Sequence, residues 1–128
     1  MIANSKSDLE SLASQRIYVA GHRGMVGQAL VRALESIGAK NLILKARDEL
    51  NLCNQSAVRS FFEFAQPDLV IFAAAKVGGI HANSTYPAEF MYDNLMMAAN
   101  AIHSAYETKV QRFLFLGSTC IYPRMAPQ

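Results

Sequence analysis

The chain has 128 residues, which is the size of one ordinary domain and short for a complete two-lobed enzyme. Hydrophobic residues make up 52% of it and charged residues 17%, a balance that excludes an intrinsically disordered chain and predicts a packed core. The formal net charge of only +2, from scattered Lys and Arg, argues against a nucleic-acid or membrane surface.

Three features argue against export, membrane insertion and metal binding. Residues 1–15 lack the apolar stretch of a signal peptide and are interpreted as a flexible leader before a domain at 16–128. No later apolar run approaches the roughly 20 residues of a membrane helix. The two cysteines, Cys53 and Cys120, lack metal-ligand spacing and are too few for a disulfide framework. We therefore expect a cytoplasmic protein with free thiols and no metal site.

Apolar strands and amphipathic helices alternate along the chain. Strands are expected at 16–20, 41–44, 69–73 and 112–116, and helices at 26–37, 58–65 and 87–105. This alternation, with strands that are apolar throughout, is typical of a parallel sheet covered by helices on both faces. Right-handed crossovers then predict an α/β fold, a truncated Rossmann-type doubly wound sheet whose first four strands have the order 3-2-1-4. A loop rich in Gly, Asn and Ser is expected before the last helix.

Glycines with the spacing Gly-x-x-Gly-x-x-Gly follow the first expected strand and open the first helix. A turn without Cβ atoms lets the backbone approach a pyrophosphate, and the free N–H groups of the helix attract its charge. The predicted cofactor-binding residues here are Gly21, His22, Arg23, Gly24, Met25, Val26 and Gly27. The alternative is a tight loop in which glycine serves only packing, but the flanking strand and amphipathic helix favour cofactor binding.

Charged residues after the second expected strand bear on the choice of dinucleotide. Arg47 stands where NAD enzymes of this fold carry an acidic residue for the ribose 2′-OH. With Arg23 it can clamp a 2′-phosphate through charge-assisted bonds, which favours NADP. Asp48 is a counter-signal, because its carboxylate can accept the 2′-OH of NAD. Ordinary surface charges, with Asp48 capping a turn, are the remaining alternative.

Four segments of the sequence carry a family resemblance. They are 20–27, 47–52, 73–80 (Ala-Ala-Ala-Lys-Val-Gly-Gly-Ile) and 115–123 (Phe-Leu-Gly-Ser-Thr-Cys-Ile-Tyr-Pro). Together they resemble the GDP-L-fucose synthases of the NAD-dependent epimerase/dehydratase family, within the extended short-chain dehydrogenases/reductases. The resemblance implies a domain that binds NADP (NADPH) in an enzyme that acts on GDP-4-keto-6-deoxy-D-mannose. It also implies that the cofactor is contacted by Leu52, Ala74, Leu116 and Gly117.

The implied reaction has two stages on one keto-sugar nucleotide. Epimerisation at C3 and C5 precedes hydride transfer from NADPH to C4, which gives GDP-L-fucose. By this resemblance Ser118 matches the serine that hydrogen-bonds the C4 oxygen, and Cys120 matches the cysteine that acts as general acid and base on the ring protons. Each also has a structural alternative, Ser118 as a turn or helix cap and Cys120 as a small buried side chain. Lys76 and Asn83, in the Gly-Gly loop, are further candidates to line the active site.

The Tyr-x-x-x-Lys pair of these enzymes is not found in this sequence, because none of the five tyrosines precedes a lysine by four positions. We therefore expect an N-terminal part of the enzyme that is inactive by itself. Two other functions stay open: another NAD(P)-dependent sugar-nucleotide epimerase or dehydratase, and a non-catalytic NADP-binding module. The resemblance further implies a nucleotide-sugar substrate, no nucleic-acid or membrane partner, and a homodimer in the full-length enzyme, with the long helix from Pro87 as the candidate contact.

Overall fold

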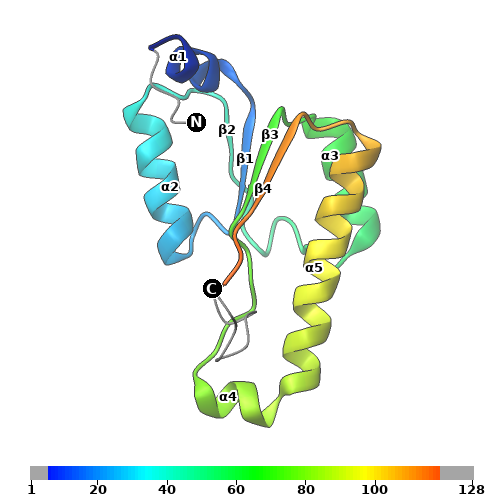
Figure 1. Cartoon of the computed structure of the whole chain (residues 1–128). Coiled ribbons are helices and arrows are strands. Elements are labelled where there is room, and N and C mark those ends of the chain that lie inside the picture. Colours follow the sequence, from blue (N-terminus) through cyan, green and yellow to red (C-terminus); the bar gives the residue numbers. More distant parts are fainter. Residues whose placement is uncertain (1–5, 119–128) are drawn as a thin grey trace, which may run out of the picture.

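The computed structural model of the protein describes residues 6–118 and shows a four-stranded parallel sheet between two helical layers (Figure 1). The elements in chain order are α1 (Lys6–Ser14), β1 (Ile17–Ala20), α2 (Met25–Ser36), β2 (Leu42–Ile43), α3 (Gln55–Ala65), β3 (Leu69–Phe72), α4 (Ile80–Thr85), α5 (Pro87–Glu107) and β4 (Arg112–Phe115). The expected doubly wound α/β fold is confirmed, because α2 covers one face and α3 with α5 covers the other. Among residues 6–118, none of the helices combines the length and the hydrophobicity that a membrane-spanning segment requires.

Two segments expected to be irregular are helical. The flexible leader expected at 1–15 is corrected for residues 6–14, which form α1, and Leu12 packs against the core beneath α2. The amide of Asn41 donates a hydrogen bond to the Ser14 carbonyl at 3.2 Å. Residues 80–85 form α4, where Asn83 donates to the Gly78 carbonyl at 3.0 Å. Such short helices form through tertiary contacts that a local pattern does not reveal.

The strand order is β2-β1-β3-β4, so the expected order 3-2-1-4 is wrong. The third strand pairs with the first, with Ile17 opposite Leu69 and Ala20 opposite Phe72, and does not pair with the second. The reason is burial: β1 and β3 are apolar and buried at every position, which suits the centre of a sheet that is covered on both faces. Strand β2 has two paired residues, both half-buried, and takes the edge.

Hydrophobic clusters on both faces hold the first strand in place. On the α3–α5 face, the Tyr18 ring lies edge-on to Phe61 and Phe62, with centroids 4.7 and 6.0 Å away. On the α2 face, Val19 packs in a cluster with Leu34. Tyr18 and Val19 are 1% and 0% exposed, so the carboxyl end of β1 is a rigid base for the turn that follows.

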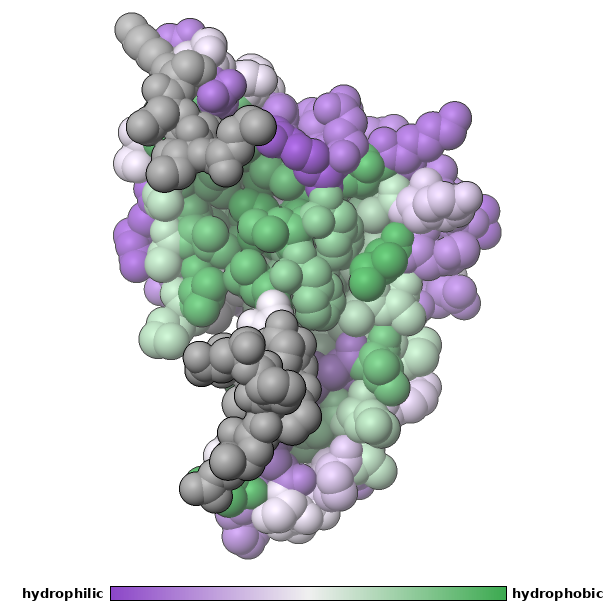
Figure 2. Space-filling model, in the orientation of Figure 1, coloured by the Kyte–Doolittle hydropathy of each residue, from purple (hydrophilic) through white to green (hydrophobic). Residues whose placement is uncertain are grey.

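Strand β4 is the least covered part of the sheet. Leu114 and Phe115 are 50% and 49% exposed, although Phe115 stacks on Phe72 with ring centroids 5.2 Å apart. Figure 2 shows a broad hydrophobic area over the sheet on this side of the molecule. Among residues 6–118, β4 has β3 as its one neighbouring strand, so its outer edge is open.

The chain leaves β1 and β3 towards opposite faces of the sheet. After β1 it enters α2 on one face, and after β3 it passes through α4 to α5 on the other (Figure 1). This divergence opens a crevice between the carboxyl ends of the two strands. Open parallel sheets bind their ligands at such switch points, so we expect the ligand site at this edge of the sheet.

Candidate functional site

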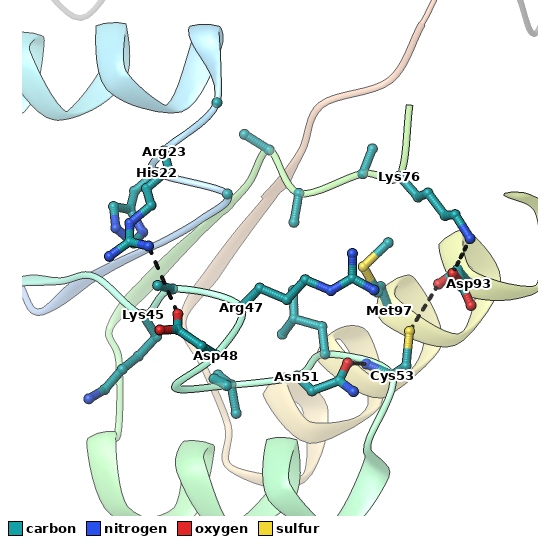
Figure 3. A pocket seen from close by; sticks show the side chains of 18 of the residues that line it. His22, Arg23, Lys45, Arg47, Asp48, Asn51, Cys53, Lys76, Asp93 and Met97 are labelled. Atoms are coloured by element: carbon teal, nitrogen blue, oxygen red, sulfur yellow. Dashed lines mark hydrogen bonds and ion pairs between the residues drawn. The ribbon is translucent and has the colours of Figure 1, made fainter. Parts of the chain in front are cut away.

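A cavity of about 560 Å³ opens at the carboxyl ends of β1 and β3 (Figure 3). This volume is within the range of cofactor sites, roughly 300–1,000 Å³. The cavity is formed by the turn after β1, the loop after β2, the first residues after β3 and the inner face of α5. The predicted cofactor-binding residues that line it are Gly21, His22, Arg23, Gly24, Arg47, Asp48, Leu52 and Ala74.

Two glycines shape the turn between β1 and α2. Gly21 has φ +80°, and a Cβ there would stand 2.7 Å from the Ala73 carbonyl oxygen. A Cβ on Gly27 would collide with the Gly21 carbonyl oxygen and come within 2.7 Å of the His22 Cα. The Gly24 N–H donates to the Gly21 carbonyl at 2.9 Å, and Gly24 is the N-cap residue of α2, without a side-chain cap. The turn is therefore tight, and the first amides of α2 are available to an anion.

The remaining residues of the turn differ in where their side chains lie. The side chains of Met25 and Val26 are 87% and 48% exposed and do not line the cavity. These two residues can therefore contribute only their main-chain amides, at the N-terminus of α2. His22 lines the cavity, and its Nδ1 is buried with no hydrogen-bond partner within residues 6–118. Buried polar atoms nearly always have a partner, so this nitrogen retains the capacity to bind a ligand atom.

Arg23 and Arg47 line the same cavity, but their side chains do not converge (Figure 3). Arg23 Nη1 lies 3.9 Å from Asp48 Oδ1 in a solvent-exposed pair. The guanidinium of Arg47 extends towards Met97 instead. An exposed ion pair contributes only about 0–1 kcal/mol, so Arg23 can leave Asp48 at little cost. A clamp for a 2′-phosphate is thus not preformed and requires the exposed Arg47 side chain to rotate.

Glu49 anchors the loop after β2. Its carboxylate accepts the Ala46 N–H at 2.9 Å and the Lys45 ammonium at 3.2 Å. The hydrogen bond from Ala46, and next the one from Lys45, hold the pKa of Glu49 below its usual value. Because Glu49 is engaged with its own loop, Asp48 is the acidic side chain that this loop presents to the cavity.

The opposite wall carries another ion pair. Lys76 Nζ lies 2.7 Å from Asp93 Oδ2 and 5.3 Å from the centroid of the Phe90 ring. The Cys53 thiol donates to the Asp93 carbonyl, with sulfur and oxygen 3.7 Å apart. Met97 lies one turn after Asp93 on α5, and both line the cavity. Sequence alone points to Lys76 and misses Asp93 and Met97, although their i, i+4 spacing places them on one side of a helix.

Tyr18 lines the cavity but is not a candidate acid. It is 1% exposed, and burial raises the pKa of its phenol above the ordinary value. Its packing against Phe61 and Phe62 identifies it as part of the core. The tyrosine role of the Tyr-x-x-x-Lys pair is therefore not taken over by this residue.

Leu116, Gly117 and Ser118 follow β4 at the same edge of the sheet but do not line this cavity. The Leu116 N–H donates to the Phe72 carbonyl at 3.1 Å, which continues the pairing of β4 with β3. Ser118 is exposed, and Cys120 lies outside the described residues. The catalytic roles of Ser118 and Cys120 stay predictions.

Comparison with known proteins decides the family. The family model described as "NAD dependent epimerase/dehydratase family" matches residues 17–128 of this chain. The chain belongs to this family. Within it, GDP-L-fucose synthase 1 of Arabidopsis thaliana is 56% identical over 124 residues, which cover 95% of this chain and 38% of that relative. The GDP-L-fucose synthase of Escherichia coli (strain K12) is 54% identical over 117 residues, which cover 91% of this chain and 36% of that relative.

Solved structures agree with this assignment to the epimerase/dehydratase family. The chain named "DdhaC" is 51% identical, with a TM-score of 0.87 over 90% of this chain and 33% of its own length. "MlghC, GDP-mannoheptose C4 reductase from Campylobacter jejuni with NADP bound" is 42% identical, with a TM-score of 0.85 over 90% of this chain and 34% of its own. The chain thus spans well under half the length of the relatives it matches.

Proposed function

We propose that the chain is the NADP-binding, N-terminal part of a GDP-L-fucose synthase. Such an enzyme epimerises GDP-4-keto-6-deoxy-D-mannose at C3 and C5 and reduces C4 with NADPH, and this part holds the cofactor. The observation that carries the proposal is a cofactor-sized cavity, at the switch point of the sheet, built from a glycine turn, a helix N-terminus and two arginines. The names of the relatives at 56% and 54% identity support GDP-L-fucose as the product.

The residues at the turn fit a dinucleotide. Because Gly21 and Gly27 have no Cβ atoms, the backbone of the turn can come close to a pyrophosphate. The first amides of α2 attract the negative charge of that group. The His22 Nδ1, which has no hydrogen-bond partner among the described residues 6–118, offers one more hydrogen bond to a polar ligand atom. Leu52 and Ala74 supply apolar wall on the other side of the cavity. The bound cofactor contributes the hydride, and these residues hold and orient it.

Arg23 and Arg47 account for a preference for NADP over NAD. A phosphate group binds guanidinium groups through paired, charge-assisted hydrogen bonds, which a ribose hydroxyl cannot match. Within residues 6–118, the Arg23 side chain pairs with the exposed Asp48, and Arg47 makes no ion pair. Both side chains are therefore able to close on a 2′-phosphate. The NADP named for the 42% identical reductase supports the same choice.

Ser118 and Cys120 are proposed to act on the sugar. Ser118 lies three residues beyond the end of β4, at the edge of the sheet where the cavity opens. A hydroxyl that donates to the C4 oxygen stabilises negative charge there while ring protons are exchanged, and polarises the carbonyl for reduction. A thiol with a pKa near 8.5 needs only modest tuning to carry those protons. Because the Tyr-x-x-x-Lys pair is not in this sequence, we propose that the chain binds cofactor without completing the reaction.

We also propose that the full enzyme is a cytoplasmic homodimer joined through α5. Met91, Leu95 and Ile102 are 67%, 60% and 49% exposed and follow helical spacing along one side of α5. An exposed apolar stripe of this kind is typical of a contact surface. Analytical ultracentrifugation of the chain and of a Leu95→Glu variant is expected to show a dimer and a monomer, respectively. A dimer that survives the variant unchanged would place the contact elsewhere.

Binding of NADPH and NADH to the purified chain tests the cofactor assignment. Isothermal titration calorimetry is expected to show NADPH binding at least about tenfold tighter than NADH, a difference of about 1.4 kcal/mol. NADPH is also expected to raise the melting temperature more than NADH, because a ligand that binds the folded state stabilises it. Equal affinities, or no binding by a chain that melts cooperatively, would contradict the proposal.

A further inference from the structure

The side chain of Asn94, on α5, is bonded at both ends to main chain. Its Oδ1 accepts the Lys76 N–H at 2.7 Å. Its Nδ2 donates to the Lys76 carbonyl at 2.9 Å and to the Phe90 carbonyl at 2.8 Å. The amide thus pairs with residue 76 as a neighbouring strand would, at a point where β3 has ended and its ladder no longer supplies partners.

This pairing fixes the wall of the cavity from outside it. Residues 73–76 line the cavity, whereas Asn94 does not. The preceding residue, Asp93, holds the Lys76 side chain at 2.7 Å, so α5 restrains both the backbone and the ammonium of Lys76. Gly78 adds to the tightness, because a Cβ there would stand 2.8 Å from the Phe90 ring.

The same helix holds the loop after β2. The Asn100 Nδ2 donates to the Leu52 carbonyl at 2.9 Å, a bond that is buried. Met97 lies between the two asparagines and lines the cavity. One helix therefore carries two amide tethers, six residues apart in sequence, to the loops that form two walls of the site.

We propose that Asn94 is a positioning residue for the dinucleotide, with Asn100 in the same role on the other loop. Through these tethers α5 holds the loops in their binding shape before the cofactor arrives, so that binding does not have to order them. The inference rests on the proposed cofactor function. It assigns a part in cofactor binding to Asn94 and Asn100, which hold the loops of the site but do not themselves line the cavity.

A substitution of the same size can distinguish the positioning of the loop through the hydrogen bonds of Asn94 from simple packing of its side chain. Asn94→Asp keeps the size of the side chain and one acceptor, but a carboxylate has no N–H to donate. Its second oxygen would face the carbonyl oxygens of Lys76 and Phe90, which repel it. A matched control is Asn41→Ala, which removes the bond from Asn41 to the Ser14 carbonyl, away from the cavity.

The test combines calorimetric titration with NADPH and amide hydrogen exchange of the ligand-free chain. In Asn94→Asp, NADPH affinity is expected to fall at least about tenfold, while Asn41→Ala changes it less than about twofold. The Lys76 amide is expected to exchange at least about tenfold faster in Asn94→Leu, which keeps a similar size and removes the oxygen that accepts this amide, with the amides of β1 and β3 still protected.

Three results would overturn the inference. One is an Asn94→Asp chain that binds NADPH as the wild type does. Another is a Lys76 amide that stays protected in Asn94→Leu. The third is loss of protection throughout β1 and β3, which would assign Asn94 to general stability. If the wild-type chain itself fails to bind NADPH, the proposed function fails, and the exchange of Lys76 still reports separately on whether the tether exists.

Discussion

The Cα of Gly21 lies so close to the end of β3 that a Cβ on it would stand 2.7 Å from the carbonyl oxygen of Ala73. The two central strands of the sheet therefore meet, at their carboxyl ends, through a turn that has no space for a side chain. This contact joins the core to the cavity, because both residues line it. The turn therefore requires glycine for two reasons: the positive φ at Gly21, and the lack of space for a Cβ beside Ala73.

Replacing Gly27 by alanine is expected to destabilise the domain. The new Cβ would collide with the Gly21 carbonyl oxygen, which is backbone and cannot turn aside as a flexible side chain would. Overpacking of this kind costs about 1–3 kcal/mol, and the displaced turn should also weaken NADPH binding. Urea unfolding and calorimetry measure the two effects. Gly79→Ala is the control, since nothing lies within 4 Å of its added Cβ, and it should change the free energy of unfolding by less than about 0.5 kcal/mol.

Arg47→Ala is expected to abolish the preference for NADPH. Loss of a guanidinium from a phosphate removes a charge-assisted bond, so NADPH affinity should fall by about tenfold or more while NADH affinity changes little. Parallel titrations with both cofactors measure this. Lys40→Ala is the control, because Lys40 is exposed and does not line the cavity. An equal loss for NADH and NADPH would show that Arg47 supports the loop and does not read the 2′-phosphate.

Asp48→Asn distinguishes the two roles open to Asp48. The carboxylate lies 3.9 Å from Arg23 and competes with a 2′-phosphate for it. We therefore expect tighter NADPH binding in the variant and unchanged NADH binding. A selective loss of NADH affinity, measured by the same titrations, would instead assign Asp48 to the 2′-OH of NAD and contradict its competition with a 2′-phosphate.

The apolar pattern predicts which segments are strands, but it does not indicate which strands lie next to one another in the sheet. The runs at 69–73 and 112–116 became β3 and β4 within a residue of the expected ends. Their order was wrong because pairing is decided by which strands can be buried on both faces, and that depends on where the helices lie. The glycine turn was predictable because its chemistry is local. The bond from Asn94 to Lys76 spans 18 positions and joins a helix to a loop, so no local pattern contains it.

The ion pair of Arg16 and Asp68 is expected to make stability depend on pH. Asp68 accepts the Arg16 side chain at 3.1 Å and the Arg16 N–H at 2.8 Å, and these bonds, the side-chain one first, lower the pKa of Asp68. A carboxyl whose pKa is lowered on folding stabilises the protein fully above its unfolded pKa of about 4, and the contribution is lost as pH falls through the folded value.

Asp68→Asn should therefore flatten the decrease in unfolding free energy below about pH 4, as measured by urea titration at several pH values. The flattening should be partial, because the pKa of Glu49 is also lowered. NADPH affinity at neutral pH should not change, since Asp68 precedes β3, at the end away from the cavity. Glu63→Gln, which removes an exposed i, i+4 partner of Arg59, is the control. An unchanged pH profile in Asp68→Asn would show that this pair does not stabilise the fold.

A completed enzyme offers the sharpest test of the claim that this chain is the cofactor-binding part of a GDP-L-fucose synthase. Residues 17–128 would replace the matching segment of the Escherichia coli relative, which is 54% identical to this chain. The chimera is expected to convert GDP-4-keto-6-deoxy-D-mannose to GDP-L-fucose with NADPH, and a Ser118→Ala version is expected to lose that turnover while it still binds NADPH. A folded chimera that binds NADPH but forms no GDP-L-fucose would contradict the claim and favour a cofactor-binding module without this activity.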